Sequence, residues 1–214
     1  MKITGQIRFI GRYIAEPYWP ERAQVIDIDK ESGVSRARSE SARVKALDAH
    51  LKKIGMTADQ FDKLKLRAAR PFHTVSDLGH PVKGHAPGEI VIPPDRILSC
   101  FVNACDQAPS ALRICKPEQL RSIISAETIF TGKQCADGTW SRAVVPKKDG
   151  KPISNQRGTR SSEYIENFAA ELVVEFSEHQ VPRKRLIDFI DWSGREIGIG
   201  ASRKMNNGRF SVSW

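Results

Sequence analysis

The first residues of the chain alternate between apolar and polar side chains, a pattern that is typical of a half-buried β-strand. In residues 2–8, Ile3 and Ile7 fall on the apolar side of this pattern. The same alternation in residues 169–176 and 209–214 predicts two more strands. Shorter apolar runs predict further strands at residues 25–28, 88–92, 128–130 and 140–145.

Three helices are predicted between these strands, each from apolar residues at helical spacing after a proline. They begin at Pro94, Pro117 and Pro182. The order strand, helix, glycine-rich loop, strand at the end of the chain matches the second half of a ferredoxin-like sandwich. The first strand and the helix from Pro94 are candidates for the other half. We therefore expect an α+β fold with a ferredoxin-like (RRM-like) core, in a single domain spanning residues 1–214.

Residues 35–70 differ in composition from the rest of the chain, with ten basic residues against four acidic ones, a local net charge of +6. Leu47 and Leu51 belong to one helical repeat, and Thr57 is placed to cap a second helix. We expect a basic helical insertion; the alternative is a solvated surface whose charges pair with one another. The candidate nucleic-acid contacts in this segment are Arg36, Arg38, Arg43, Lys45, Lys52 and Lys53.

A second basic segment, residues 146–161, has no apolar period. It is polar and contains glycine and proline, residues that interrupt regular structure. Such segments usually lie on the surface and vary in conformation more than the elements that they connect. We therefore predict an exposed, mobile basic loop here.

The net charge indicates which kind of partner the protein binds. The chain carries 34 Lys and Arg against 25 Asp and Glu, a formal net charge of +9. Such a balance favours polyanionic partners, although it can also serve only to keep a protein soluble. No apolar run approaches the length of about 20 residues that spans a bilayer, and no secretory signal is recognisable. We expect a cytoplasmic protein that does not bind membranes.

Metal and cofactor chemistry is not indicated. The four cysteines lack CxxC spacing, so we expect reduced thiols, no metal site and no cofactor. No motif of a hydrolase or a metalloprotease is present, and the expectation is a protein without enzymatic activity. The histidines most available as general acids or bases, should a ribonuclease activity exist, are His73, His80 and His85.

The segment from Gly194 to Phe210 combines glycines with cationic side chains. Glycine permits positive φ and close backbone approach, and amides exposed in such a turn can form an anion-binding concavity. Arginine contacts phosphate bidentately and lysine acts as a point charge. A structural turn with surface charges is the alternative interpretation. The candidate phosphate contacts are Gly198, Gly200, Ser202, Arg203, Lys204, Gly208 and Arg209.

This helix, glycine loop and terminal strand resemble the glycine-rich loop of the RAMP superfamily, the ferredoxin-like RNA-binding subunits of CRISPR effector complexes. The same ending is also similar to that of uncharacterised phage-encoded proteins. The RAMP resemblance implies that the glycines and cations named above touch the RNA backbone or an adjacent subunit. It also implies that residues 36–70 occupy the place of an inserted, guide-contacting element.

The sequence therefore favours a non-catalytic protein that holds single-stranded RNA or DNA, RNA first, through its phosphates. It would act with other protein subunits or by self-association, for example in a CRISPR-like ribonucleoprotein. One alternative is a phage-encoded structural or interaction protein whose basic surface meets a protein partner. A second alternative is a metal-independent endoribonuclease.

Overall fold

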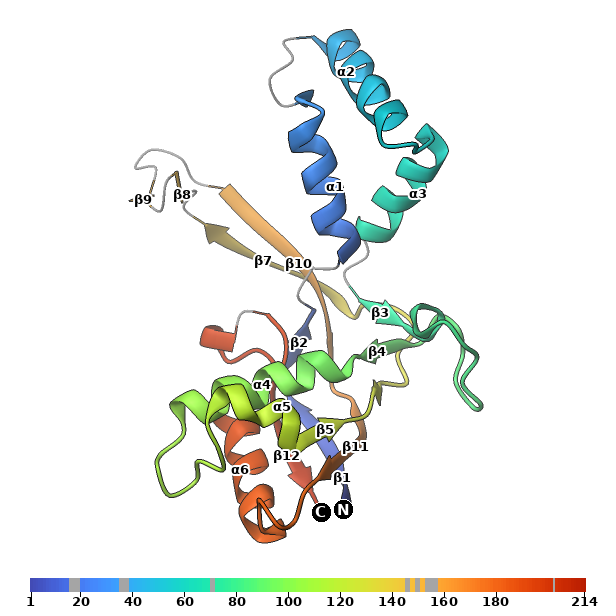
Figure 1. Cartoon of the computed structure of the whole chain (residues 1–214). Helices are drawn as coiled ribbons and strands as arrows, with labels where there is room; N and C mark the ends of the chain where they lie inside the picture. Colours follow the sequence, from blue (N-terminus) through green and yellow to red (C-terminus); the bar gives the residue numbers. More distant parts are fainter. Residues whose placement is uncertain are drawn as a thin grey trace. The chain divides into compact units, whose positions relative to one another are not determined.

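The computed structural model describes residues 1–15, 20–34, 39–69, 72–144, 147–148, 151–152, 158–201 and 203–214. The chain divides into two compact units. The first, here the α+β unit, contains residues 1–15 and 72–214, and the second, here the inserted unit, contains residues 16–71. Figure 1 shows the elements of both units.

The main sheet of the α+β unit has four antiparallel strands in the order β12-β1-β11-β5. The alternation predicted for the first strand is present, because every second residue of β1 is buried. Ile7 lies opposite Ala170 on one neighbouring strand and Val212 on the other. The strands are β1 (Lys2–Ile10), β5 (Ile124–Ala126), β11 (Ala169–Phe176) and β12 (Arg209–Ser213).

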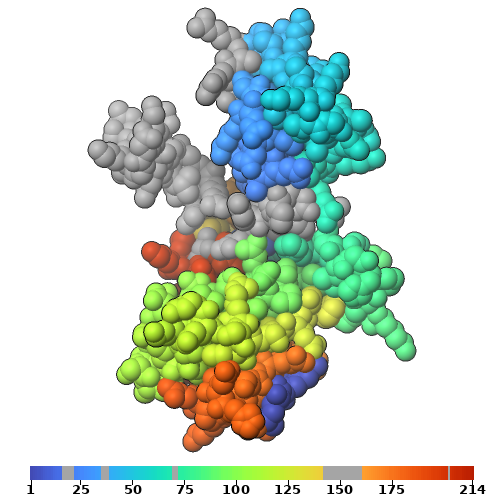
Figure 2. All heavy atoms as spheres, viewed as in Figure 1, coloured from blue at the N-terminus to red at the C-terminus, as the bar shows by residue number. Residues whose placement is uncertain are grey.

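Two helices cover the apolar face of this sheet, α4 (Pro94–Gln107) and α6 (Arg183–Glu196). They begin where their prolines predict. The rings of Phe101 and Phe189 pack between them, with centroids 6.0 Å apart. In Figure 2 the residues of α4 (green) and α6 (orange) make up much of the face in view. The buried aliphatic and aromatic side chains of both helices and of the sheet form one continuous core.

Smaller elements complete the α+β unit. A second sheet has the order β2-β10-β7 and a third the order β3-β4-β6. The strands are β2 (Arg12–Ile14), β3 (His73–Thr74), β4 (Ile90–Ile92), β6 (Ile129–Phe130), β7 (Gly138–Val144), β8 (Lys147–Lys148), β9 (Lys151–Pro152) and β10 (Gly158–Glu166). The short helices are η2 (Val75–Leu78), η3 (Pro117–Gln119), α5 (Leu120–Ile123) and η4 (Arg203–Met205).

The inserted unit contains three helices, α1 (Pro20–Glu31), α2 (Glu40–Lys53) and α3 (Ala58–Ala69). They enclose a small core of their own around Ile28, Leu51 and Phe61. Thr57 caps α3 as predicted. Its hydroxyl oxygen accepts from the amide of Gln60 at 3.2 Å, and the Gln60 side chain accepts from the amide of Thr57 at 2.8 Å.

Three sequence predictions need correction. The strand expected at residues 25–28 is wrong, because these residues belong to α1 and bury Val25 and Ile28 at helical spacing. A short apolar run does not distinguish the two structures. The insertion is larger than residues 35–70, since α1 packs with the other two helices. Within the loop expected at residues 146–161, Gly158–Ser161 pair with β7, and β8 and β9 pair with each other. Residues 146, 149–150 and 153–157 of this loop lie outside the described residues.

Candidate nucleic-acid interface

The glycine-rich segment after α6 is a compact turn, and its glycines are buried. Gly198, Gly200 and Gly208 have φ angles of +77°, +94° and +74°. A Cβ at Gly198 would lie 2.7 Å from the carbonyl oxygen of Gly208, and a Cβ at Gly208 would overlap the carbonyl of Ile199. Positive φ and close backbone approach, the two properties predicted from sequence, are therefore both used for packing within the protein.

The amides of this turn donate to carbonyls inside the protein. Ile199 donates to Gly208 at 2.8 Å, Ala201 donates to Ile14 at 2.8 Å, and Gly208 donates to Arg12 at 2.7 Å. These bonds tie the turn to β2 and close it on itself. At these positions the amides are engaged, so they do not form the anion-binding concavity expected from the sequence. Any contact of this segment with an anion would therefore have to come from its side chains.

Arg203 and Arg209 both act electrostatically on Cys100 of α4. Burial raises the pKa of the Cys100 thiol to about 12, and both guanidinium groups oppose this effect by lowering it. Cys100 is fully buried on α4. The side chain of Lys204, on the same short helix as Arg203, is exposed.

One side-chain nitrogen of Arg209 lacks a hydrogen-bond partner. Nη1 of Arg209 is buried and makes no hydrogen bond within the described part of the chain. Among the same residues, no carboxylate forms an ion pair with Arg203, Lys204 or Arg209. A buried donor without a partner is costly, and a buried cation is usually paired. The arrangement therefore has unused capacity for an anion.

The charges of the inserted unit allowed two interpretations, a nucleic-acid-binding surface and a solvated surface whose charges pair with one another. The ion pairs in the structure distinguish between them. On α3, Lys63 pairs with Asp59 at 2.8 Å and Lys65 pairs with Asp62 at 2.8 Å, as expected for a solvated surface. On α2, Arg43 pairs with Glu40 at 3.7 Å. Only the solvated interpretation fits these three cations.

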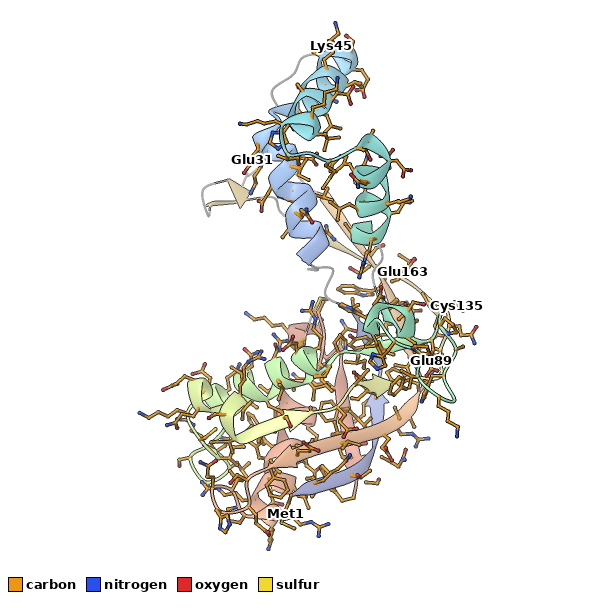
Figure 3. The ribbon with its side chains drawn as sticks, turned by 45° about the vertical axis from the view of Figure 1, so that its right-hand side comes forward. Met1, Glu31, Lys45, Glu89, Cys135 and Glu163 are labelled. Carbon is orange, nitrogen blue, oxygen red and sulfur yellow. The ribbon has the colours of Figure 1, made fainter. Side chains whose placement is uncertain are left out.

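Three other lysines of α2 are different. Lys45, Lys52 and Lys53 are exposed and form no ion pair with any residue that the structure describes. Lys45 and Lys52 are seven residues apart and share a side of the helix away from buried Leu51. Lys52 and Lys53 also lie in the last turn, where the helix dipole favours cations. Figure 3 shows Lys45 projecting outward from α2.

Some predicted site residues lie outside the described residues, namely Arg36, Arg38 and Ser202. The histidines proposed for catalysis are brought together only in part. His80 and His85 line one cavity, whereas His73 lies on β3 opposite Val91. In the described part of the chain, no group of three or more His, Cys, Asp or Glu side chains is placed to hold a metal ion. None of the described helices is long and apolar enough to cross a membrane.

The open face of the main sheet carries mixed charges rather than a basic surface. Its exposed residues on β1 and β11 include Lys2, Arg8, Glu171 and Glu175. Lys2 forms an ion pair with Glu127 at the edge of this face. RRM proteins stack bases on aromatic side chains of the corresponding sheet surface. The aromatic side chains of these strands lie instead in the core, so the sheet face is not an equivalent platform.

No protein-family model matches the chain, and no curated protein is similar to it. Among solved structures, the chain is similar to one in the cryo-EM structure of the type III-B Cmr-beta bound to cognate target RNA, with 10% identity and a TM-score of 0.45. That match covers 100% of this chain and 58% of the other. The crystal structure of Cmr6 from Pyrococcus furiosus is similar with 11% identity and a TM-score of 0.34, over 100% of this chain and 98% of the other.

Proposed function

We propose that this protein binds the phosphate backbone of single-stranded RNA without cleaving it. The observation that carries the proposal is the buried, unpartnered Nη1 of Arg209. Arg203 adds a second positive charge that, like Arg209, acts on buried Cys100. A guanidinium group offers several donors in a planar fork that matches phosphate oxygens. A phosphate at this position would satisfy the orphan donor and neutralise two neighbouring cations. The exposed Lys204 adds a third positive charge.

The chain order of the α+β unit supports a ferredoxin-like core for this function. Its main elements follow one another as β1, α4, β5, β11, α6 and β12. Numbering the four strands along the chain gives the sheet order 4-1-3-2, with all pairs antiparallel. This is the β-α-β-β-α-β arrangement of the ferredoxin-like folds. The inserted unit lies between β2 and β3 in the sequence, within the connection from β1 to α4.

The types of charged residue favour recognition of the phosphate backbone over recognition of the bases. The cations of this proposal are Arg203, Lys204 and Arg209 and the exposed lysines of α2, for which no carboxylate partner is found among the described residues. Arginine and lysine contacts of this kind bind phosphates independently of sequence. RNA is proposed over DNA because of the resemblance of the glycine-rich segment to the RAMP loop. Assembly with other protein subunits, or self-association along the strand, stays a prediction from that same resemblance.

The wild-type protein is expected to bind single-stranded RNA with an affinity that falls steeply as salt is raised. Each phosphate contact contributes about −0.7 to the slope of log K against log salt for a single strand. Fluorescence anisotropy with labelled single-stranded RNA, single-stranded DNA and duplex DNA of equal length measures both the slope and the ligand ranking. Tighter binding of DNA would correct the identity of the polymer.

Absence of binding to all three nucleic acids would contradict the proposal and favour the protein-partner alternative. RNA cleavage by the wild-type protein that is lost on replacing His85 with alanine would instead favour an endoribonuclease. Gel analysis of the RNA recovered from each binding mixture separates these outcomes.

The lysines of α2 are expected to contribute to the salt dependence. Replacing Lys45, Lys52 and Lys53 with glutamine should reduce the magnitude of the salt slope by about 2, since up to three phosphate contacts are lost. The control replaces Lys63 and Lys65, which are ion-paired on α3, with glutamine. An equal reduction by both variants would show that net charge, and not a surface on α2, determines the effect.

A further inference from the structure

A cavity of about 350 Å³ lies in the α+β unit at the loop between β3 and β4. Two imidazoles, His80 and His85, line it, and Val75, Pro81 and Val82 contribute apolar walls. Its volume is at the lower end of the range found for small-molecule sites. The phosphate contacts proposed above do not use this cavity, so its chemistry calls for a ligand of a different kind.

The ring of His85 is fixed from several directions. It stacks on Phe130 with a centroid distance of 3.9 Å, and its Nδ1 lies 2.9 Å from Oε2 of Glu89. Glu89 is buried, and its Oε1 accepts from the amide of Gly132 at 2.9 Å. A side chain whose rotamer is held by packing and by a second layer of hydrogen bonds is typical of a functional position. Glu89 is labelled in Figure 3.

The partners of both histidines also determine which ring nitrogen remains available. Nδ1 of His80 lies 3.0 Å from the carbonyl oxygen of Leu78, and Nδ1 of His85 lies beside a carboxylate. A carbonyl oxygen and a carboxylate act here as acceptors, so each Nδ1 must carry the hydrogen. In the neutral ring, Nε2 is then an acceptor. The cavity therefore offers two imidazole acceptors between apolar surfaces.

The loop that forms the cavity is held in place by its own hydrogen bonds. The amide of Thr74 donates to Asp77 at 2.8 Å, and the amide and hydroxyl of Ser76 donate to the carbonyl of Pro87 at 3.0 and 2.8 Å. Val75 donates to the carbonyl of Glu89 at 2.9 Å. These bonds occupy polar groups that would otherwise be open to a ligand. They leave a preformed site whose polar specificity comes from the histidines.

We propose that this cavity binds one unstacked nucleobase that carries an exocyclic amino group, an inference that rests on the proposed binding of single-stranded RNA. A flat base fits apolar walls and stacks on histidine, as single-stranded RNA commonly does on proteins. The amino group of cytosine, adenine or guanine donates to Nε2. Uracil presents a carbonyl oxygen in place of the amino group, and this oxygen finds no donor in the neutral imidazole. Its only Watson–Crick-edge donor is N3–H, which lies between two carbonyls, so uracil must take a different orientation to donate to Nε2.

Oligocytidine and oligouridine of equal length test the inference, since the two bases differ only on the Watson–Crick edge: an amino group against a carbonyl at position 4, and an acceptor against a donor at N3. Fluorescence anisotropy is expected to show about fivefold tighter binding of oligocytidine, the effect of one hydrogen bond of ordinary net strength. His85→Phe keeps a ring that stacks on Phe130 but removes Nε2, so it should equalise the two affinities. His80→Ala provides a second variant on a more exposed residue.

The outcomes separate this inference from the proposed function. Equal binding of both oligonucleotides by the wild-type protein, or a preference unchanged in both histidine variants, overturns the inference alone. Absence of binding to either oligonucleotide overturns the proposed function and the inference with it. Charge reversal at Arg203 should weaken the binding of both oligonucleotides by the same factor, because both have the same phosphate backbone.

Discussion

Replacing Gly208 with alanine is expected to lower the free energy of unfolding by about 2 to 5 kcal/mol. The residue has a φ of +74°, which an L side chain adopts at a cost. A Cβ there would also overlap the carbonyl of Ile199, a backbone atom that cannot rotate away. The amide of Ile199 donates to the carbonyl of Gly208 at 2.8 Å and holds the two sides of the turn together. Moving the two backbone segments apart to relieve the overlap would break this hydrogen bond.

Gly132 is the matched control for this substitution. Its φ is +70°, but nothing lies within 4 Å of the position that a Cβ would occupy. Gly132→Ala should therefore cost only the conformational term, about 1 kcal/mol. Chemical denaturation of both variants measures the difference. Equal destabilisation would show that the close approach at Gly208 is relieved by movement of the turn, and that the glycine is required only for its φ.

Reversing the charges of Arg203 and Arg209 is expected to weaken binding of single-stranded RNA by at least about a hundredfold. Each hydrogen bond to a charged group contributes about 1.5 to 3 kcal/mol, and two such contacts are lost. The glutamates would also repel the phosphate electrostatically. Anisotropy at constant salt measures the loss for Arg203→Glu/Arg209→Glu, and thermal unfolding checks that the variant folds.

The control for net charge is Arg183→Glu/Lys184→Glu, on exposed residues in the first turn of α6. This pair changes the charge of the protein by the same amount, and glutamate is favourable at a helix N-terminus. Its affinity should change by less than about threefold at moderate salt, where distant charges are screened. If both pairs weaken binding equally, no phosphate site exists at Arg209. If the reversed pair does not fold, Arg203→Gln/Arg209→Gln replaces it.

For the glycine-rich segment, the local conformation was predicted correctly but the partner of the close approach was not. Its glycines were expected to have positive φ and to allow close backbone approach, and both properties are present. The approaching partner, however, is the backbone of the protein itself. At Gly200 this partner is the carbonyl of Ile14 on β2, more than 180 residues away in the chain, so no local pattern identifies it.

The support of the histidine cavity was also out of reach of the sequence. His80 and His85 were candidates only as general acids or bases, and the cavity that they line belongs to one continuous segment, residues 75–87. The residues that fix the ring of His85, Phe130 directly and Gly132 through Glu89, come from a distant segment. The pairing of β4 with β6 brings that segment to Glu89 and His85, which spacing along the chain does not predict.

The sequence by itself determined β1, β11 and β12, because their apolar and polar residues alternate, and α4 and α6, because their apolar residues recur at helical spacing after a proline. It also determined the basic balance of the chain. Only the tertiary structure decided the order of the strands, the helical state of residues 25–28 and the burial of the unpartnered Nη1 of Arg209. Periodicity reports which side of an element is apolar, whereas long-range packing decides what that side meets and which charges remain unpaired.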